Sequence, residues 1–114
     1  MPLSELTKKQ VEKKLGSYCK EKAPAHSKAE LRLDFIFRGN TVTLFEERPS
    51  FDKPETWVQS VIAQFRFNPL TKEWTLYWAD RNSRWHPYEK VEPSMNFEVL
   101  LTEVDKDPTG IFRG

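Results

Sequence analysis

Alternating apolar and polar residues between positions 31 and 48 restrict the possible folds of this chain more than any other stretch. The alternation is interrupted once, by Gly39-Asn40, a dipeptide that suits a two-residue hairpin turn. Pairing Arg38 with Thr41 would place the apolar residues of both arms on one face of the hairpin. The stretch therefore predicts two antiparallel strands, at about 31–38 and 41–48.

The side chains on the two faces of this hairpin support the same register. On one face Phe37 meets Val42, which is an apolar contact. On the other face Arg32 lies opposite Glu47, a pair of opposite charges. Ile36 also falls on this second face, which is therefore expected not to be fully polar.

The region from Trp57 to Tyr88 continues the sheet pattern and contains all four tryptophans. Turn-forming residues divide it at Pro69 and after Asp80. Pro87 lacks a backbone donor and belongs in an edge strand. The region predicts three more strands, the last of them short, at about 57–68, 73–79 and 84–88.

The alternation also assigns side chains to the two faces of this predicted sheet. One face is expected to be buried and to hold a series of apolar residues: Val61, Ala63, Phe65, Phe67, Trp74, Leu76, Trp78 and Trp85. Ile62 is expected on the opposite face. That opposite face also receives polar and aromatic side chains from adjacent strands: Gln64, Arg66, Thr75, Tyr77, Arg84 and His86.

Helical periodicity flanks the strands on both sides. Apolar residues recur every three or four positions in residues 4–23 and include Leu6, Val11 and Leu15. A second amphipathic helix is expected at 94–105, with Ser94 as its N-cap. The fold class is therefore α+β: an N-terminal helix, an antiparallel meander of about five strands, and a C-terminal helix packed on one sheet face.

Length and composition favour one domain over residues 1–114. The first residues lack the apolar core of a signal peptide, and no apolar run approaches a membrane span. A cytoplasmic protein without membrane contact is expected.

The net charge is +1, but the charges are unevenly distributed. Seven lysines and four glutamates lie in residues 1–30, whereas three basic and six acidic residues lie in 89–114. The two ends could pair with each other or face different partners.

Three stretches resemble a known family: Trp74-Thr-Leu-Tyr-Trp-Ala-Asp-Arg-Asn82, Trp85-His-Pro-Tyr88 and Asp107-Pro-Thr-Gly-Ile-Phe-Arg-Gly114. They are similar to a bacterial family known only as a domain of unknown function, number three-zero-two-four in its series. The similarity extends from about residue 7 to residue 114. It implies a small bacterial cytosolic protein, and it brings no activity, cofactor or catalytic residue.

Residue types for metal or covalent chemistry are sparse. Only His26, His86 and Cys19 could serve as soft ligands, and their spacing does not match a structural zinc site. Cys19 lies near the apolar stripe of the first helix and is expected to be a buried, inert thiol. The four glycines form no phosphate-binding loop. No cofactor, no metal and no enzymatic activity are expected.

The polar and aromatic sheet face remains the candidate binding surface. Aromatic and cationic side chains on a sheet can stack bases and contact phosphates, although an ordinary solvated face fits the same pattern. Three functions stay open: a non-enzymatic protein-binding or adaptor domain, a nucleic-acid binder that uses this face and the lysine-rich helix, and a small-molecule pocket near His86. The first is favoured. The protein partner is unknown, and the oligomeric state is not determined.

Overall fold

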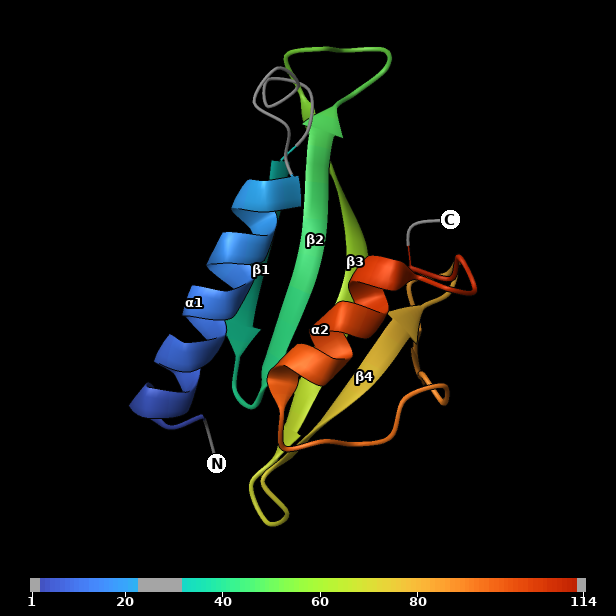
Figure 1. Ribbon diagram of the computed structural model, residues 1–114. Helices are drawn as coiled ribbons and strands as arrows, with labels where there is room; N and C mark the ends of the chain where they lie inside the picture. The colour runs from blue at the N-terminus through green and yellow to red at the C-terminus, as the bar shows by residue number, and fades with distance from the viewer. Residues whose placement is uncertain (1–2, 23–31, 113–114) are drawn as a thin grey trace.

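The computed structural model describes residues 3–22 and 32–112, and it has the predicted helix–sheet–helix order (Figure 1). The elements are α1 (Glu5–Lys22), β1 (Arg32–Arg38), β2 (Thr41–Pro49), β3 (Trp57–Asn68), β4 (Glu73–Ala79), β5 (Trp85–Pro87) and α2 (Phe97–Lys106). The predicted α+β class is confirmed. The expected end of the first helix at residue 23 and the expected strand start at Leu31 lie outside the described residues.

The five strands form one antiparallel sheet in the order β1-β2-β3-β4-β5. The predicted hairpin register is confirmed: Arg38 pairs with Thr41, and Arg32 pairs with Glu47. Gly39 in the turn has a φ of 59°, a conformation that a glycine adopts without strain. Ile36 lies on the second face, as the pattern indicates, and it is exposed.

Both helices cover the same face of the sheet (Figure 1). The helix α1 packs on β1, and α2 packs on β4. One core lies between them and the sheet, and it includes Leu15 from α1, Phe65 from β3 and Leu100 from α2, all with exposed fractions of 0%. The other face of the sheet, called here the open face, is covered by no helix among the described residues.

A β-bulge in β3 corrects the predicted faces of two residues. Leu44 pairs with Ala63, but the next residue, Phe45, pairs with Val61, so Ile62 is the extra residue. Beyond the bulge the alternation is reversed. Ile62 is therefore buried and Val61 is exposed, which is the opposite of the prediction.

The register of β5 corrects a second assignment. His86 pairs with Trp78, whereas Tyr77 pairs with Pro87. Paired residues share a face, so His86 lies on the same side as Trp78 and Trp85 on the opposite side. The predictions that His86 shares a face with Tyr77 and that Trp85 shares the buried face with Trp78 are both wrong. The strand is three residues long, which agrees with the short edge strand expected from Pro87.

Two details of the helices also differ from the predictions. The N-cap of α2 is Asn96, whose side chain accepts a hydrogen bond from the Glu98 amide, and Ser94 instead bridges to Trp74. Leu6 was expected on the buried stripe of α1 but is 69% exposed. It lies in the first turn of the helix, before the helix reaches the core.

The outer strand β1 carries a side chain that satisfies its own backbone. The Asp34 carboxylate accepts a hydrogen bond of 2.8 Å from the Phe35 amide. At alternate positions of an edge strand the amides point away from the sheet and have no strand partner. The carboxylate of Asp34 supplies that partner at Phe35.

Candidate functional site

The structure brings together four of the predicted binding residues on the open face. The guanidinium of Arg66 lies 3.8 Å from the ring centre of Tyr77. Arg66 Nε also donates to Gln64 Oε1 at 2.8 Å, and Thr75 of β4 pairs with Arg66 of β3. Gln64 Nε2 in turn donates to Thr43 Oγ1 at 3.0 Å. The result is a small, mutually bonded polar and aromatic cluster.

The other two predicted residues lie apart from this cluster. Arg84 is exposed and precedes β5. His86 stacks on Trp78 with ring centres 4.7 Å apart, and its Nε2 lies 2.7 Å from Asp80 Oδ2. Asp80 Oδ1 also accepts hydrogen bonds from the amides of Asn82 and Arg84.

These contacts make Asp80 the centre of the turn between β4 and β5. The pKa of Asp80 is lowered to about 2. The hydrogen bond with His86 is the largest cause, and the bond from the Arg84 amide is the second. An aspartate that bonds to amides two and four residues ahead is a common way to hold a tight turn. Asp80 therefore links the backbone of the turn to the His86 side chain, whereas Arg66 is the cation of the cluster on the open face.

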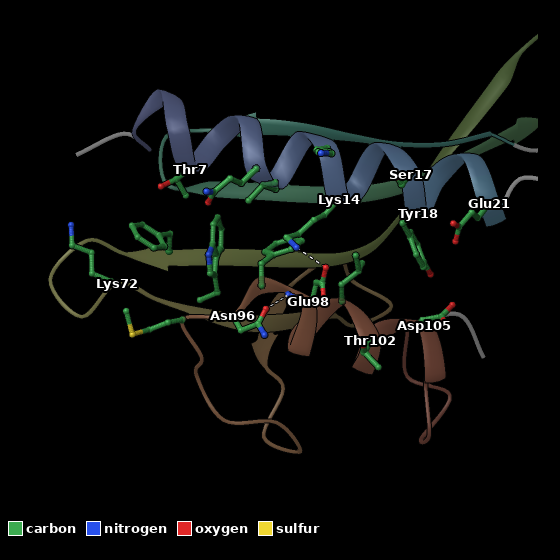
Figure 2. Close-up of a pocket in the computed structure, with 18 residues that line it drawn as sticks. Thr7, Lys14, Ser17, Tyr18, Glu21, Lys72, Asn96, Glu98, Thr102 and Asp105 are labelled. Carbon is green, nitrogen blue, oxygen red and sulfur yellow. Dashed lines mark hydrogen bonds and ion pairs between the residues drawn. The ribbon is translucent and has the colours of Figure 1, made fainter.

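A groove between α1 and α2 is a concave feature that the sequence did not reveal (Figure 2). Its volume is about 1070 Å³. The sides are formed by one face of each helix, and Phe67 and Trp74 of the β3–β4 hairpin contribute to the floor. Lys72 from the turn of that hairpin and Asn96 at the start of α2 lie at one end, and Met95, which also lines the groove, directly precedes Asn96 in the chain.

The floor of the groove is apolar and its rim is charged. The floor residues Trp74 and Leu101 belong to the core and expose 3% and 8% of their surface. At the rim, Lys14 of α1 and Glu98 of α2 form an ion pair of 2.5 Å across the groove. The Glu98 side chain is 60% exposed, so this pair contributes only about 0.2–1 kcal/mol.

A weak signal for the groove exists in the sequence. The apolar stripes of the two helices indicate that both pack on a sheet, and five strands about 4.8 Å apart are wider than one helix of about 10 Å diameter. Two helices that cover the two ends of such a sheet can leave a channel between them. The sequence pattern does not fix how far apart the helices lie, and this distance determines whether the channel exists.

The described residues offer little for metal or thiol chemistry. They contain no group of three or more His, Cys, Asp or Glu side chains arranged to hold a metal ion. Cys19 is half-buried. Burial, followed by the nearby Asp34 charge, raises the pKa of Cys19 to about 11, so the thiol is protonated at neutral pH.

Comparisons with known proteins give one match. A family model described as "Domain of unknown function (DUF3024)" matches residues 3–114. No curated protein and no solved structure matches the chain. Within the described residues, no helix has the length and apolar character needed to cross a membrane.

Proposed function

The chain belongs to this family of unknown function, and on that premise we propose that it is a non-enzymatic, cytoplasmic protein-binding domain of bacteria. A segment of a partner protein binds in the groove between α1 and α2. The observation that carries the proposal is the groove itself, with its apolar floor and charged rim. In an adaptor role, the same contact would attach the partner to another molecule.

The size and shape of the groove support a polypeptide ligand. Clefts for small molecules have volumes of about 300–1000 Å³, and most of the ligand surface is enclosed in them. This groove is slightly larger and extends along α1 from Thr7 to Glu21. Peptide grooves of this kind combine apolar contacts on the floor with polar contacts on the rim.

The ion pair that crosses the groove does not prevent binding. The side chains of Lys14 and Glu98 are long and partly exposed. Their separation costs no more than the small contribution of the exposed pair, and an incoming segment can supply new partners for both charges. Residues on both sides of the groove are therefore available to a ligand.

The alternative of nucleic-acid binding has weaker support, because the proposed basic residues lie far from one another in the fold. Arg66 is on the open face, whereas the lysines of α1 belong to a helix on the opposite face. Affinity for nucleic acid depends on several basic groups that contact one phosphate backbone. The cluster around Arg66 and Tyr77 provides one cation, and Arg84 lies in a separate turn.

Selection from a random peptide library tests the proposal. We expect peptides selected on the purified protein to shift the amide NMR signals of Phe67, Trp74 and Met95, which lie in the groove. The variant Ser17→Trp fills the groove from an exposed position and should weaken binding at least tenfold. Glu12→Trp, at an exposed position of the same helix that does not line the groove, is the matched control. Peptides that bind elsewhere, or that are unaffected by Ser17→Trp, would refute the proposal.

A further inference from the structure

Charged side chains along the groove are separated by sign. At one end and toward the middle, the lining contains Lys72, Lys13 and Lys14. At the other end it contains Glu21 of α1 and Asp105 of α2 (Figure 2). Glu98, near the middle, is paired with Lys14. A ligand in the groove therefore meets positive charge at one end and negative charge at the other.

The two helices add to this separation because they run in the same direction. Along the groove, Thr7, Lys14 and Glu21 of α1 follow the same order as Asn96, Glu98 and Asp105 of α2 (Figure 2). Both N-termini, where helix dipoles are positive, lie at the lysine end. Both C-termini, where the dipoles are negative, lie at the end with Glu21 and Asp105.

We propose that the occupant of the groove is an amphipathic α-helix of a partner protein that lies antiparallel to α1 and α2, with basic residues near its N-terminus and acidic residues near its C-terminus. This inference rests on the protein-binding function proposed above. In this orientation the acidic end of the ligand lies toward Lys72 and Lys13. Its basic end meets Glu21 and Asp105, and its dipole opposes those of both neighbouring helices.

The length and floor of the groove fit such a helix. From Thr7 to Glu21 the helix α1 rises about 21 Å at 1.5 Å per residue, which corresponds to roughly four turns of a ligand helix. Apolar side chains at i, i+3, i+4 and i+7 of the ligand would face Phe67, Trp74 and Leu101. The exposed Met95 at the lysine end provides an adaptable contact for the last apolar side chain of the ligand, near its C-terminus.

Two synthetic peptides test the inference. Both have about 16 residues, one leucine face and a hydrocarbon staple on the opposite face, which equalises their helix content. The first has lysines in its first turn and glutamates in its last, and the second has these charges exchanged. At 50 mM salt we expect the first peptide to bind about five- to tenfold more tightly by fluorescence anisotropy, and the difference should shrink at 0.5 M salt because exposed charges are screened.

Charge-exchange variants of the protein provide the reciprocal test. Lys13→Glu combined with Glu21→Lys reverses part of the charge separation at the groove without changing the net charge. This double variant should reduce or invert the preference for the first peptide. Lys9→Glu combined with Glu12→Lys makes the same exchange at exposed positions of α1 outside the groove and should leave the preference unchanged.

A paramagnetic label at the N-terminus of the first peptide determines its orientation. We expect the label to broaden the amide signals near Glu21 and Asp105, and a label at the C-terminus to broaden those near Lys72 and Met95.

Equal affinities of the two peptides, or a parallel orientation, would overturn the inference. If library peptides bind in the groove but both helical peptides do not, the inference fails and the protein-binding proposal stands. If no peptide perturbs the groove, both fail.

Discussion

Tyr88 shows how one buried hydroxyl connects the end of the sheet to the second helix. Its ring packs against Phe112 with ring centres 4.9 Å apart, and its hydroxyl donates a hydrogen bond of 2.7 Å to Glu103 Oε2. The side chain exposes only 4% of its surface. Burial, followed by this hydrogen bond, raises the pKa of Tyr88 to about 12.

The raised pKa of Tyr88 predicts a loss of stability in alkaline solution. The unfolded tyrosine releases its proton near pH 10 and the folded one near 12, so the stabilisation is complete below pH 10 and decreases as the pH rises toward 12. Tyr88→Phe should cost about 1–2 kcal/mol at pH 8. At pH 11 its cost should be smaller by about 1.4 kcal/mol, measured by urea unfolding of both proteins. An unchanged difference between pH 8 and pH 11 would contradict this explanation.

Cys19 is predicted to react slowly with alkylating reagents. Its pKa of about 11, against an ordinary value of 9.0, reduces the thiolate fraction about 100-fold at pH 8. Iodoacetamide should therefore modify the folded protein at least tenfold more slowly than the urea-unfolded protein, as followed by mass spectrometry. Asp34→Asn removes the second cause of the raised pKa and should accelerate the reaction modestly. Equal rates in the folded and unfolded states would show that the thiol is freely accessible and not perturbed.

Single residues also show where sequence patterns succeed and fail. The faces of Phe37 and Val42 follow from strict alternation and a two-residue turn, so both could be predicted. Val61 and Ile62 could not, because a β-bulge reverses the alternation and no residue type specifies a bulge at that point. His86 was misplaced because the register of a three-residue strand depends on the turn before it.

At the scale of whole elements, the start of α2 depends on a local hydrogen bond. The Asn96 side chain accepts from the Glu98 amide at 3.1 Å, which satisfies one of the unpaired donors in the first turn. Ser94 Oγ accepts from the Asn96 amide, outside the helix. Both residue types are good N-caps, so the sequence alone did not distinguish between them.

Substitutions at these two positions separate their roles. Asn96→Ala should lower the free energy of unfolding by about 1 kcal/mol, because the cap is lost. Ser94→Ala leaves the cap in place and should cost less than half as much. Urea unfolding monitored by circular dichroism measures both, and a larger loss for Ser94→Ala would assign the cap to Ser94.

At the scale of the whole molecule, one core joins both helices to the sheet. Leu15 of α1 and Leu100 of α2 are fully buried in the same cluster. Leu100→Ala should lower the stability by about 2–5 kcal/mol. Because the core is shared, the loss should affect α1 as well as α2, and unfolding followed by tryptophan fluorescence and by helical circular dichroism should coincide. Separate transitions would show that α1 unfolds independently.

The packing of the two helices in the whole molecule is the reason why the groove could not be predicted from the sequence. Each wall is an ordinary amphipathic helix, and each helix was placed on the sheet by its own apolar stripe. The groove arises from the distance between the two helices, whose residues Lys14 and Glu98 lie 84 positions apart in the chain. Such a distance is a property of packing, and alternation within one element carries no information about it.

The hydrogen bond between Asp34 and the Phe35 amide has a consequence for association between copies of the chain. A bare sheet edge can recruit a strand from a neighbouring molecule and start a fibril. Here the edge strand satisfies one of its outward amides internally and presents a negative charge to any approaching chain. The residue that stabilises the backbone locally thereby also disfavours strand pairing at this edge.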